Sequence, residues 1–318
     1  MGNYIIRRVL LLIPTFLILT ILVFMFVRLM PGNVISLMVM SAPHEGTSQL
    51  DVRAVQHMLG LDQPALTQYW NFLSGLLRGD MGKSLWTTQN VTTEVLARLP
   101  ITFELGLFAF IIAQLVAFPV GILSAIRQDS IGDYIARSIT ILFVAAPVFW
   151  LGTMVMVFPS IWWHWSPQIT YISPGENLGA NIEQFLVPAT ILGIGMAALE
   201  MRMLRTTMLD ILRQDFVRTA WSKGLGERVV ITRHVLRNAS LPVVTIISGQ
   251  IPVLISGEVI LEQIFNLPGM GRLFVDSITS RDYPYVTGMN ALFCVVGLVL
   301  ILLCDLSYAW LDPRIRYH

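Results

Sequence analysis

Charge is scarce in this chain of 318 residues. Asp, Glu, Lys and Arg make up only 13% of it, whereas hydrophobic residues make up 55%. A soluble domain carries about a quarter charged residues, so a chain this poor in charge needs a solvent other than water. The formal net charge of +1 leaves no global basic signal for nucleic-acid binding. The composition predicts an integral membrane protein whose surroundings are membrane lipid rather than nucleic acid.

Cysteine is nearly absent, since the chain has only Cys294 and Cys304. Ten residues apart on a helix, they would lie about 15 Å from each other along its axis, whereas a disulfide needs Cα atoms within about 7 Å. We interpret both as small buried hydrophobic residues. The five histidines and the cysteines form no cluster with metal-ligand spacing. We therefore expect no metal site and no catalytic residue in this chain.

A nucleotide-binding loop is also missing. Gly82-Lys83-Ser84 resembles the end of a P-loop, but the glycine that the motif requires five residues earlier is Leu77 here. We expect this chain to bind no ATP and no other cofactor of its own.

The chain does contain six apolar runs of about 20 residues, each long enough to cross a hydrocarbon core of about 30 Å. They lie near residues 9–29, 102–126, 138–161, 186–207, 242–265 and 291–311. Because a lone span must satisfy its own backbone hydrogen bonds, we predict an all-α membrane protein with six transmembrane helices. The first run is long for a signal peptide and lacks a small-residue cleavage site, so we expect it to be retained. Some runs contain prolines, which predict either kinks in a moving bundle or plain packing: Pro119, Pro147, Pro188 and Pro252.

Basic residues gather on one side of the predicted spans. The larger set lies close to the helix ends and consists of Arg7, Arg8, Arg127, Arg137, Arg202, Arg205, Arg213, Arg218, Lys223, Arg228, Arg233, Arg237, Arg314 and Arg316. The opposite side holds Arg28, Arg53, Arg78, Lys83, Arg98, Arg272 and Arg281. The positive-inside rule therefore places both termini in the cytoplasm.

Two connecting segments are too long to be simple loops. The outer segment, 30–100, has helical patterns at 52–59 and 64–77, and the second has proline at its start and Gly79 after its end. It predicts a helical extracytoplasmic segment between spans 1 and 2. The inner segment, 208–240, predicts a short helix at 215–223, a glycine break, and a second helix that leads back into the membrane.

The inner segment reads DFVRTAWSKGLGER from residue 215 and RHVLRNA from residue 233. It resembles the coupling loop of binding-protein-dependent ABC importer permeases, in which a Glu-Ala-Ala triplet is followed three residues later by glycine. Here the triplet is Arg218-Thr219-Ala220 and the glycine is Gly224. The glutamate of the general pattern is missing, but the longer reading is similar to the peptide and nickel branch of the family.

This resemblance extends over nearly the whole chain. The segments that carry it are 4–8, 28–32, 60–64, 68–69, 79–84, 267–272, 281–284, 305–308 and 312–316. One departure is Asn33-Val34, where the family usually has Asp-Pro. The pattern around 60–84 looks like that of the first permease of such operons, and members of the branch import dipeptides, oligopeptides, nickel chelates, glutathione or oligosaccharides.

The resemblance implies a type I importer permease fold in a bacterial inner membrane. Its implied partners are a second permease in a heterodimer, two subunits that bind ATP and Mg, and an extracytoplasmic solute-binding protein. The chain would divide into a tail and first span (1–29), the outer segment (30–100) and a permease core (101–318) that contains the coupling loop.

The implied site residues fall into three groups. ATPase coupling would involve Asp215, Phe216, Arg218, Thr219, Ala220, Lys223, Gly224 and Glu227. The translocation path would involve Gln250, Ser256, Glu258 and Glu262, although a wetted interfacial face is the alternative for the two glutamates. Binding-protein docking would involve Asp80, Lys83, Arg272 and Asp282.

Two further acids have two interpretations each. Glu200 either forms an interfacial ion pair with Arg202 and Arg205 or makes a gating contact, and Asp305 is either paired structurally or functional within the membrane. As a whole, the chain could instead be a lone ion-coupled transporter or channel. That alternative expects an internal repeat, which the sequence lacks, and has no use for the inner helix at 215–223.

Overall fold

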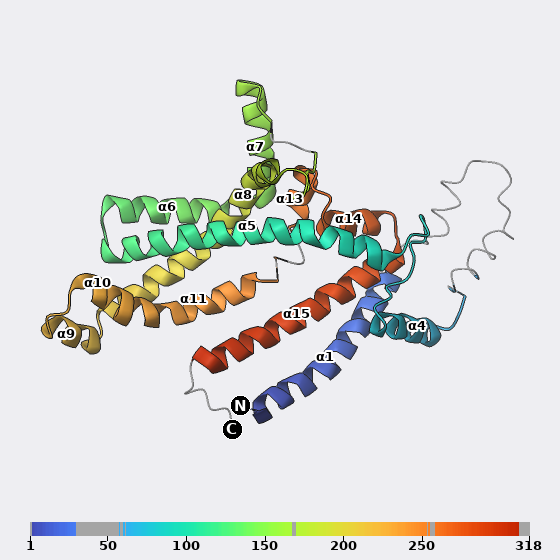
Figure 1. Ribbon diagram of the computed structural model, residues 1–318, viewed down its shortest axis with the longest axis horizontal. Helices are drawn as coiled ribbons and strands as arrows, with labels where there is room; N and C mark the ends of the chain where they lie inside the picture. The colour runs from blue at the N-terminus through green and yellow to red at the C-terminus, as the bar shows by residue number, and fades with distance from the viewer. Residues whose placement is uncertain are drawn as a thin grey trace. The chain divides into compact units, whose positions relative to one another are not determined.

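The computed structural model describes residues 2–29, 57, 60, 62–166, 170–252, 254 and 258–311, with the side chains of 2–7, 9, 27 and 304–311 excepted. Every regular element in this part of the chain is helical (Figure 1). The elements are α1 (Gly2–Leu29), α4 (Ala65–Leu77), α5 (Val91–Ile126), α6 (Ile131–Ala145), α7 (Val148–Trp163), α8 (Leu178–Leu212), α9 (Asp215–Ser222), α10 (Glu227–Val229), the π-helical η1 (Val230–Leu236), α11 (Arg237–Gln250), α13 (Val259–Ile264), α14 (Met270–Thr279) and α15 (Tyr283–Leu311). The all-helical prediction is confirmed for these residues.

Three of the described helices are long and apolar enough to cross a membrane: Val91–Ile126, Leu178–Leu212 and Tyr283–Leu303. The pair α6 and α7 adds a fourth if the two count as one broken span, and α1 contributes a shorter apolar stretch, Leu10–Phe26.

Two of the four prolines coincide with breaks in the helices. Pro147 separates α6 from α7, which are bent by 99°. Pro252 lies in the gap between α11 and α13, so the expected span at 242–265 is not one continuous helix. Proline has no N–H and clashes with the preceding turn, which accounts for both interruptions. Pro119 and Pro188 instead lie inside the continuous helices α5 and α8.

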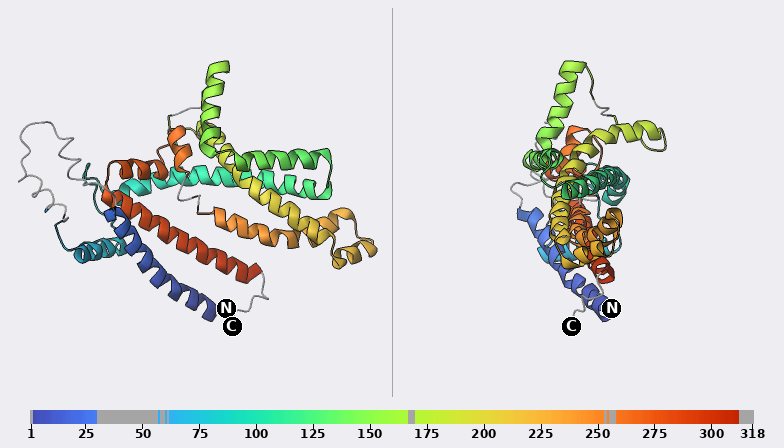
Figure 2. Two further views of the ribbon diagram at one scale, coloured as in Figure 1. Left: turned by 180° about the vertical axis from the view of Figure 1, so that it is seen from behind. Right: turned by 90° about the vertical axis from the view of Figure 1, so that its left-hand side faces the viewer.

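The described chain forms two compact units, one of residues 1–100 with 270–318 and the other of residues 101–269. In the first unit, α1 runs alongside α15 (Figures 1 and 2). Helix α4 joins α1 through aromatic contacts, because the Phe24 ring lies 5.4 Å from Tyr69 and 6.2 Å from Phe72.

Helix α4 confirms the predicted helix at 64–77. Its last residue is Leu77, and Gly79 follows with a φ of +78° that suits glycine. The amide of Asp80 donates back to the carbonyl of Gly75 at 2.9 Å. Of its apolar stripe, only Leu73 is buried. The other helical pattern of the outer segment, at 52–59, lies outside the described residues apart from His57.

In the second unit, α5 and α8 approach closely through small residues. Ala109, Ala113 and Ala117 recur every four residues on α5 and are fully buried. Facing them, Gly193 leaves no room for a side chain, since a Cβ there would lie 2.6 Å from the carbonyl oxygen of Ala109. Small residues at helix interfaces are typical of membrane bundles.

Candidate functional site

The short helix α9 projects from the end of α8, where the sequence predicts the coupling loop (Figure 1). Its last residue is Ser222, and Gly224 follows with a φ of +77°. The amide of Gly224 donates to the carbonyl of Trp221 at 2.9 Å, and that of Leu225 donates to the carbonyl of Ala220 at 3.4 Å. This pair of bonds is the Schellman pattern, whose left-handed position glycine adopts without strain. The predicted helix and its glycine break are confirmed.

Helix α9 turns one apolar stripe toward its own chain. Val217 and Ala220 are buried in an apolar cluster with Leu204 and Met208 of α8. The other buried members of this cluster, which we call the coupling cluster, are Ala125, Val230, Ile231, Val235, Ala239 and Val243. Five helices, α5, α8, α9, η1 and α11, therefore contribute side chains to this cluster.

The outward face of α9 corrects one part of the sequence prediction. Phe216 and Ala220 were both assigned to ATPase coupling, but Ala220 is only 5% exposed and belongs to the coupling cluster. Val217 and Ala220, three residues apart, are the pair that points inward. The apolar side chains left outside are Phe216 and Trp221, 41% and 42% exposed.

The polar residues of the coupling loop are open to solvent. Asp215 and Arg218 form an ion pair at 3.7 Å with both side chains largely exposed, an arrangement that contributes little to stability. Thr219 donates to the carbonyl of Asp215 at 2.9 Å. Lys223 and Glu227 are exposed, and Glu227 lies in the first turn of α10.

The return path from α9 to the membrane contains a π-helical stretch. The η1 segment, seven residues long, joins α10 to α11. Runs of π-helix are rare and often mark functional positions. Next to η1, Thr207 of α8 donates to the carbonyl of Ala239 in α11 at 3.1 Å. This bond ties the two helices together beside the coupling cluster.

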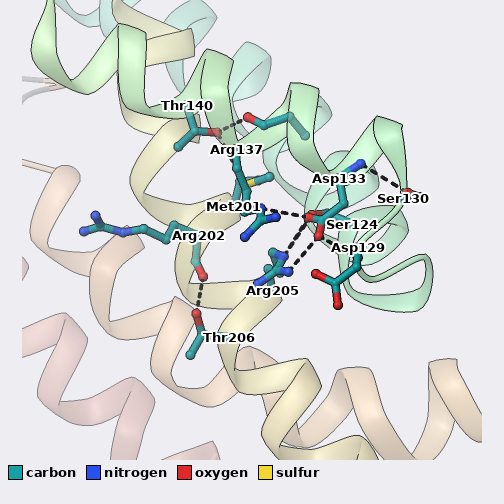
Figure 3. Close-up of polar contacts among 11 residues, drawn as sticks. Ser124, Asp129, Ser130, Asp133, Arg137, Thr140, Met201, Arg202, Arg205 and Thr206 are labelled. Atoms are coloured by element: carbon teal, nitrogen blue, oxygen red, sulfur yellow. Dashed lines mark hydrogen bonds and ion pairs between the residues drawn. The ribbon is translucent and has the colours of Figure 1, made fainter.

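A buried ion pair that was not predicted from the sequence lies near the C-terminal end of α8. Asp133, in the first turn of α6, has a fully buried side chain. Arg205 of α8 donates to it from Nε and Nη2, both at 2.8 Å, so that both carboxylate oxygens are bound (Figure 3). Ser124 of α5 donates to one of these oxygens, and the backbone amide of Asp129 donates to the other at 3.0 Å. Arg137 lies 3.6 Å away, too far for a hydrogen bond.

One local signal pointed to this position. Ser130 precedes Asp133 by three residues at the start of α6, and its hydroxyl oxygen accepts a hydrogen bond from the amide of Asp133 at 3.2 Å. That spacing is an N-cap signature, but it carries no information about a partner 72 residues further along the chain.

The same region overturns the ion pair expected for Glu200. Glu200 is fully buried, and both of its carboxylate oxygens accept from Nε2 of Gln114, at 2.9 and 3.1 Å. Arg202 is exposed, and Arg205 is bound to Asp133. Residues two and five positions along a helix do not share a face with Glu200, which is the physical reason for the difference.

The predicted path residues lie around the break between α11 and α13. Gln250 donates to the carbonyl of Met196 at 3.3 Å, and Glu258 is half-buried at the start of α13. Glu262 is fully buried and accepts from Thr102 at 2.7 Å, so a wetted face is wrong for this residue. Ser256 lies outside the described residues, as does the side chain of Asp305.

A glycine opposite Glu262 makes room for its carboxylate. A Cβ on Gly269 would lie 2.5 Å from each carboxylate oxygen. A side chain at position 269 would therefore push the Glu262 carboxylate out of its place, which gives a structural reason for glycine in the Leu-Pro-Gly sequence at 267–269.

The predicted docking residues separate into exposed and buried ones. Asp80 and Lys83 are exposed, and Arg272 lies 3.9 Å from Asp276. Asp282 is only 3% exposed, which corrects its assignment to a docking surface. It accepts from the hydroxyl of Ser84 at 2.5 Å and from the amide of Leu85 at 3.1 Å.

Asp282 therefore fixes the loop that follows α4. Burial raises the pKa of its carboxyl, and the hydrogen bonds from Ser84 and Leu85 oppose that shift. The same loop explains why Gly82-Lys83-Ser84 is not a P-loop. No helix starts after Ser84, since α5 begins only at Val91, whereas a P-loop leads directly into a helix N-terminus.

Comparison with known proteins covers nearly the whole chain. Residues 117–317 match the family described as binding-protein-dependent transport system inner membrane component. Residues 1–106 match the N-terminal model of the corresponding membrane components.

Individual relatives match at full length. The glutathione transport system permease protein of Pectobacterium atrosepticum is 37% identical over 317 residues, which is 100% of both chains. The dipeptide transport system permease protein of Escherichia coli strain K12 is 36% identical and covers 100% of this chain and 99% of its own. The glutathione permease protein of Salmonella typhi is 36% identical over 100% of both chains.

Proposed function

This chain belongs to the binding-protein-dependent transport system inner membrane components, and on that premise we propose that it is the permease subunit of an ATP-driven importer for dipeptides or oligopeptides. The observation that carries the proposal is α9, a helix with an inward stripe in the coupling cluster and two exposed apolar side chains, Phe216 and Trp221, on either side of that stripe. Relatives named as dipeptide and glutathione permeases support the peptide class. Nickel chelates, glutathione and oligosaccharides are the alternatives within the same kind of complex.

We place six spans in the membrane with both termini in the cytoplasm, and the outer segment on the opposite side. The distribution of basic residues supports this orientation, because the coupling loop is rich in arginine and lies at helix ends. In this topology α9 faces the compartment that holds ATP.

The partners in this proposal are a second permease, two ATP-binding subunits and an extracytoplasmic solute-binding protein. The exposed apolar side chains of α9 would enter a groove on an ATP-binding subunit, with Arg218, Lys223 and Glu227 at the rim. ATP and Mg would be bound and hydrolysed by those subunits, and this chain would carry out no bond chemistry.

Movement would pass from the ATP-binding subunits to the membrane helices through α9. Val217 and Ala220 share the coupling cluster with residues of α8, η1 and α11, so a displacement of α9 would strain the packing of those helices. Closely packed interiors transmit strain in this way. Alternating access would then follow from the response of the broken segment that contains Gln250 and Glu258.

Docking of the binding protein is assigned to three residues of the first unit, the exposed Asp80 and Lys83 and the half-buried Arg272. Asp80 also lines a cavity of about 530 Å³ together with Arg28, Asn71 and Tyr283. Charged residues beside a cavity at this position are compatible with docking of a solute-loaded binding protein.

Transport in reconstituted proteoliposomes tests the function. The four membrane-associated subunits from one operon would be purified together, with their binding protein added outside. We expect uptake of labelled dialanine that needs both the binding protein and internal ATP, with glutathione tested in parallel. Uptake driven by an ion gradient without ATP would support the ion-coupled transporter and overturn the proposal.

A further inference from the structure

Helix α6 has an unusual attachment to its unit. Its only fully buried residue is Asp133, whereas apolar side chains along its length are open: Ile131 is 80% exposed, Leu142 is 63% exposed and Ile139 is 47% exposed. An apolar helix face normally supplies most of the contact that holds a helix in place. Helix α6 offers the apolar core the partly buried Ala136, so within the described chain its one fully buried contact is made by a charged group.

Asp133 is held from three directions. The guanidinium of Arg205 binds both carboxylate oxygens, Ser124 binds one of them from α5, and the amide of Asp129 closes the turn before α6 (Figure 3). Two parallel hydrogen bonds between guanidinium and carboxylate fix orientation as well as distance. The arrangement therefore sets the angle at which α6 meets α8, which apolar contact alone would not do.

Arg205 also lies beside the residues that hold the coupling helix. Leu204 and Met208, immediately before it and one turn after it on α8, are fully buried in the coupling cluster with Val217 and Ala220 of α9. One short stretch of α8 thus bonds α6 through charge and α9 through apolar packing. No other described contact of α6 combines full burial with a fixed geometry.

We propose that Asp133 and Arg205 are positioning residues for transport, forming a polar joint that makes α6 move with α8 and α9 as one body. The inference rests on the proposed function, because it assigns these residues to the route by which α9 moves the membrane helices. They touch neither ATP nor substrate in this account. Their replacement should therefore leave ATP hydrolysis by the partner subunits possible while disconnecting it from transport.

Distance measurements test the joint directly. After Cys294 and Cys304 are replaced, spin labels at Ile139→Cys of α6 and Thr232→Cys of η1 report on α6 against the coupling loop. Labels at Thr206→Cys of α8 and Thr232→Cys form the control pair. With Asp133 and Arg205 in place, the 139–232 pair and the 206–232 control pair should each give one narrow distance distribution. The distributions are measured by pulsed EPR in the complete complex, with and without ATP and vanadate.

The double variant Asp133→Asn with Arg205→Gln removes both charges, so that no buried charge is left unpaired. We expect the distribution between 139 and 232 to broaden at least twofold in this variant, while that between 206 and 232 stays narrow. A distribution between 139 and 232 that stays narrow would overturn the proposal.

A functional comparison separates a joint from a purely structural pair. In proteoliposomes with dialanine and the binding protein, the double variant should hydrolyse ATP at no less than half the reference basal rate but transport at least tenfold fewer peptides per ATP. If the pair were merely structural, a double variant that assembles into the complex should also transport normally. Restored transport would therefore contradict the joint.

Arg205→Lys keeps the positive charge but loses the two parallel hydrogen bonds to Asp133. It therefore tests whether the geometry of the pair, rather than its charge, is needed for transport. We expect a threefold or larger fall in peptides transported per ATP. The matched control is Arg202→Gln, an exposed arginine on the same helix (Figure 3), which should transport normally. Unchanged transport in Arg205→Lys would count against the joint, whereas absence of ATP-driven transport in the unsubstituted complex would refute the proposed function itself.

Discussion

Helices α6 and α9 are both attached to the cytoplasmic half of α8 in our topology, but by different chemistry. Helix α9 uses apolar packing, with Val217 and Ala220 inside the coupling cluster. Helix α6 uses charge, with Asp133 bound by Arg205. Apolar contacts are non-directional and scale with area, whereas the ion pair fixes one geometry. The comparison indicates that α9 is held to α8 by shared buried area, whereas α6 is held to α8 at one set angle.

The largest effect should come from placing charge in the apolar attachment. Ala220→Asp would bury a carboxylate with no partner in the coupling cluster, at a cost of about 3–5 kcal/mol. We expect loss of the assembled complex or more than tenfold loss of binding-protein-stimulated ATP hydrolysis. Ser222→Asp places the same charge on an exposed position of α9 and should keep most activity. Full stimulation in Ala220→Asp would show that α9 is not held by packing.

A slightly smaller effect is expected when one partner of the polar attachment is removed. Asp133→Ala strands the Arg205 charge and Arg205→Ala strands the Asp133 carboxylate, each destabilising by about 3 kcal/mol. The double variant should lose much less than the sum of the two single losses. Thermal unfolding of the purified complex provides the double-mutant cycle. Simple additivity of the two losses would mean that these residues do not act as a pair.

A third test breaks the end of α9 without touching its packing. Gly224 has a φ of +77°, and a Cβ there would meet nothing within 4 Å. Gly224→Ala therefore costs only backbone strain, about 1–2 kcal/mol, and Gly224→Val should cost more. We expect a several-fold fall in stimulated ATP hydrolysis with normal membrane insertion.

Gly226→Ala is the control for that strain, since Gly226 has a φ of −63° and equally open space. It should behave as the reference protein. If Gly224→Ala and Gly226→Ala were indistinguishable in stimulated hydrolysis, the left-handed turn would have no part in coupling.

The smallest effects concern the loop after α4, which repeats the polar attachment in the first unit. Ser84→Ala leaves the buried Asp282 without its hydroxyl donor and should destabilise by about 1–3 kcal/mol. Lys83→Ala should alter neither stability nor basal ATP hydrolysis, because Lys83 is exposed and belongs to no P-loop. Loss of basal hydrolysis in Lys83→Ala would contradict this interpretation.

Local signals in the sequence predicted the local structure well. Helix α4 with Gly79 and helix α9 with Gly224 follow from periodicity and from glycines that have positive φ. The break at Pro252 was foreseen only as one option, because a proline in an apolar run can kink a helix or be tolerated within it, as Pro188 is in α8.

Long-range partners could not be predicted in the same way. Asp133 and Arg205 belong to different helices, and Glu200 pairs with Gln114 from another helix rather than with nearby arginines. The inward position of Ala220 depends on where α8 and η1 lie, which the pattern of α9 alone does not specify. Tertiary packing decides such contacts, so a single sequence carries little trace of them.

The central claim is that α9 seats on an ATP-binding partner through a surface that includes Phe216. Replacing Phe216 with a photoreactive benzoylphenylalanine in living cells, with Thr206 of α8 as an exposed control position, tests it most directly. Illumination should join position 216, and not position 206, to a subunit that mass spectrometry identifies as an ATP-binding protein, with yields that change when ATP and vanadate are added to membranes. Crosslinks from position 216 to lipid alone, or to no ATP-binding protein, would contradict the account.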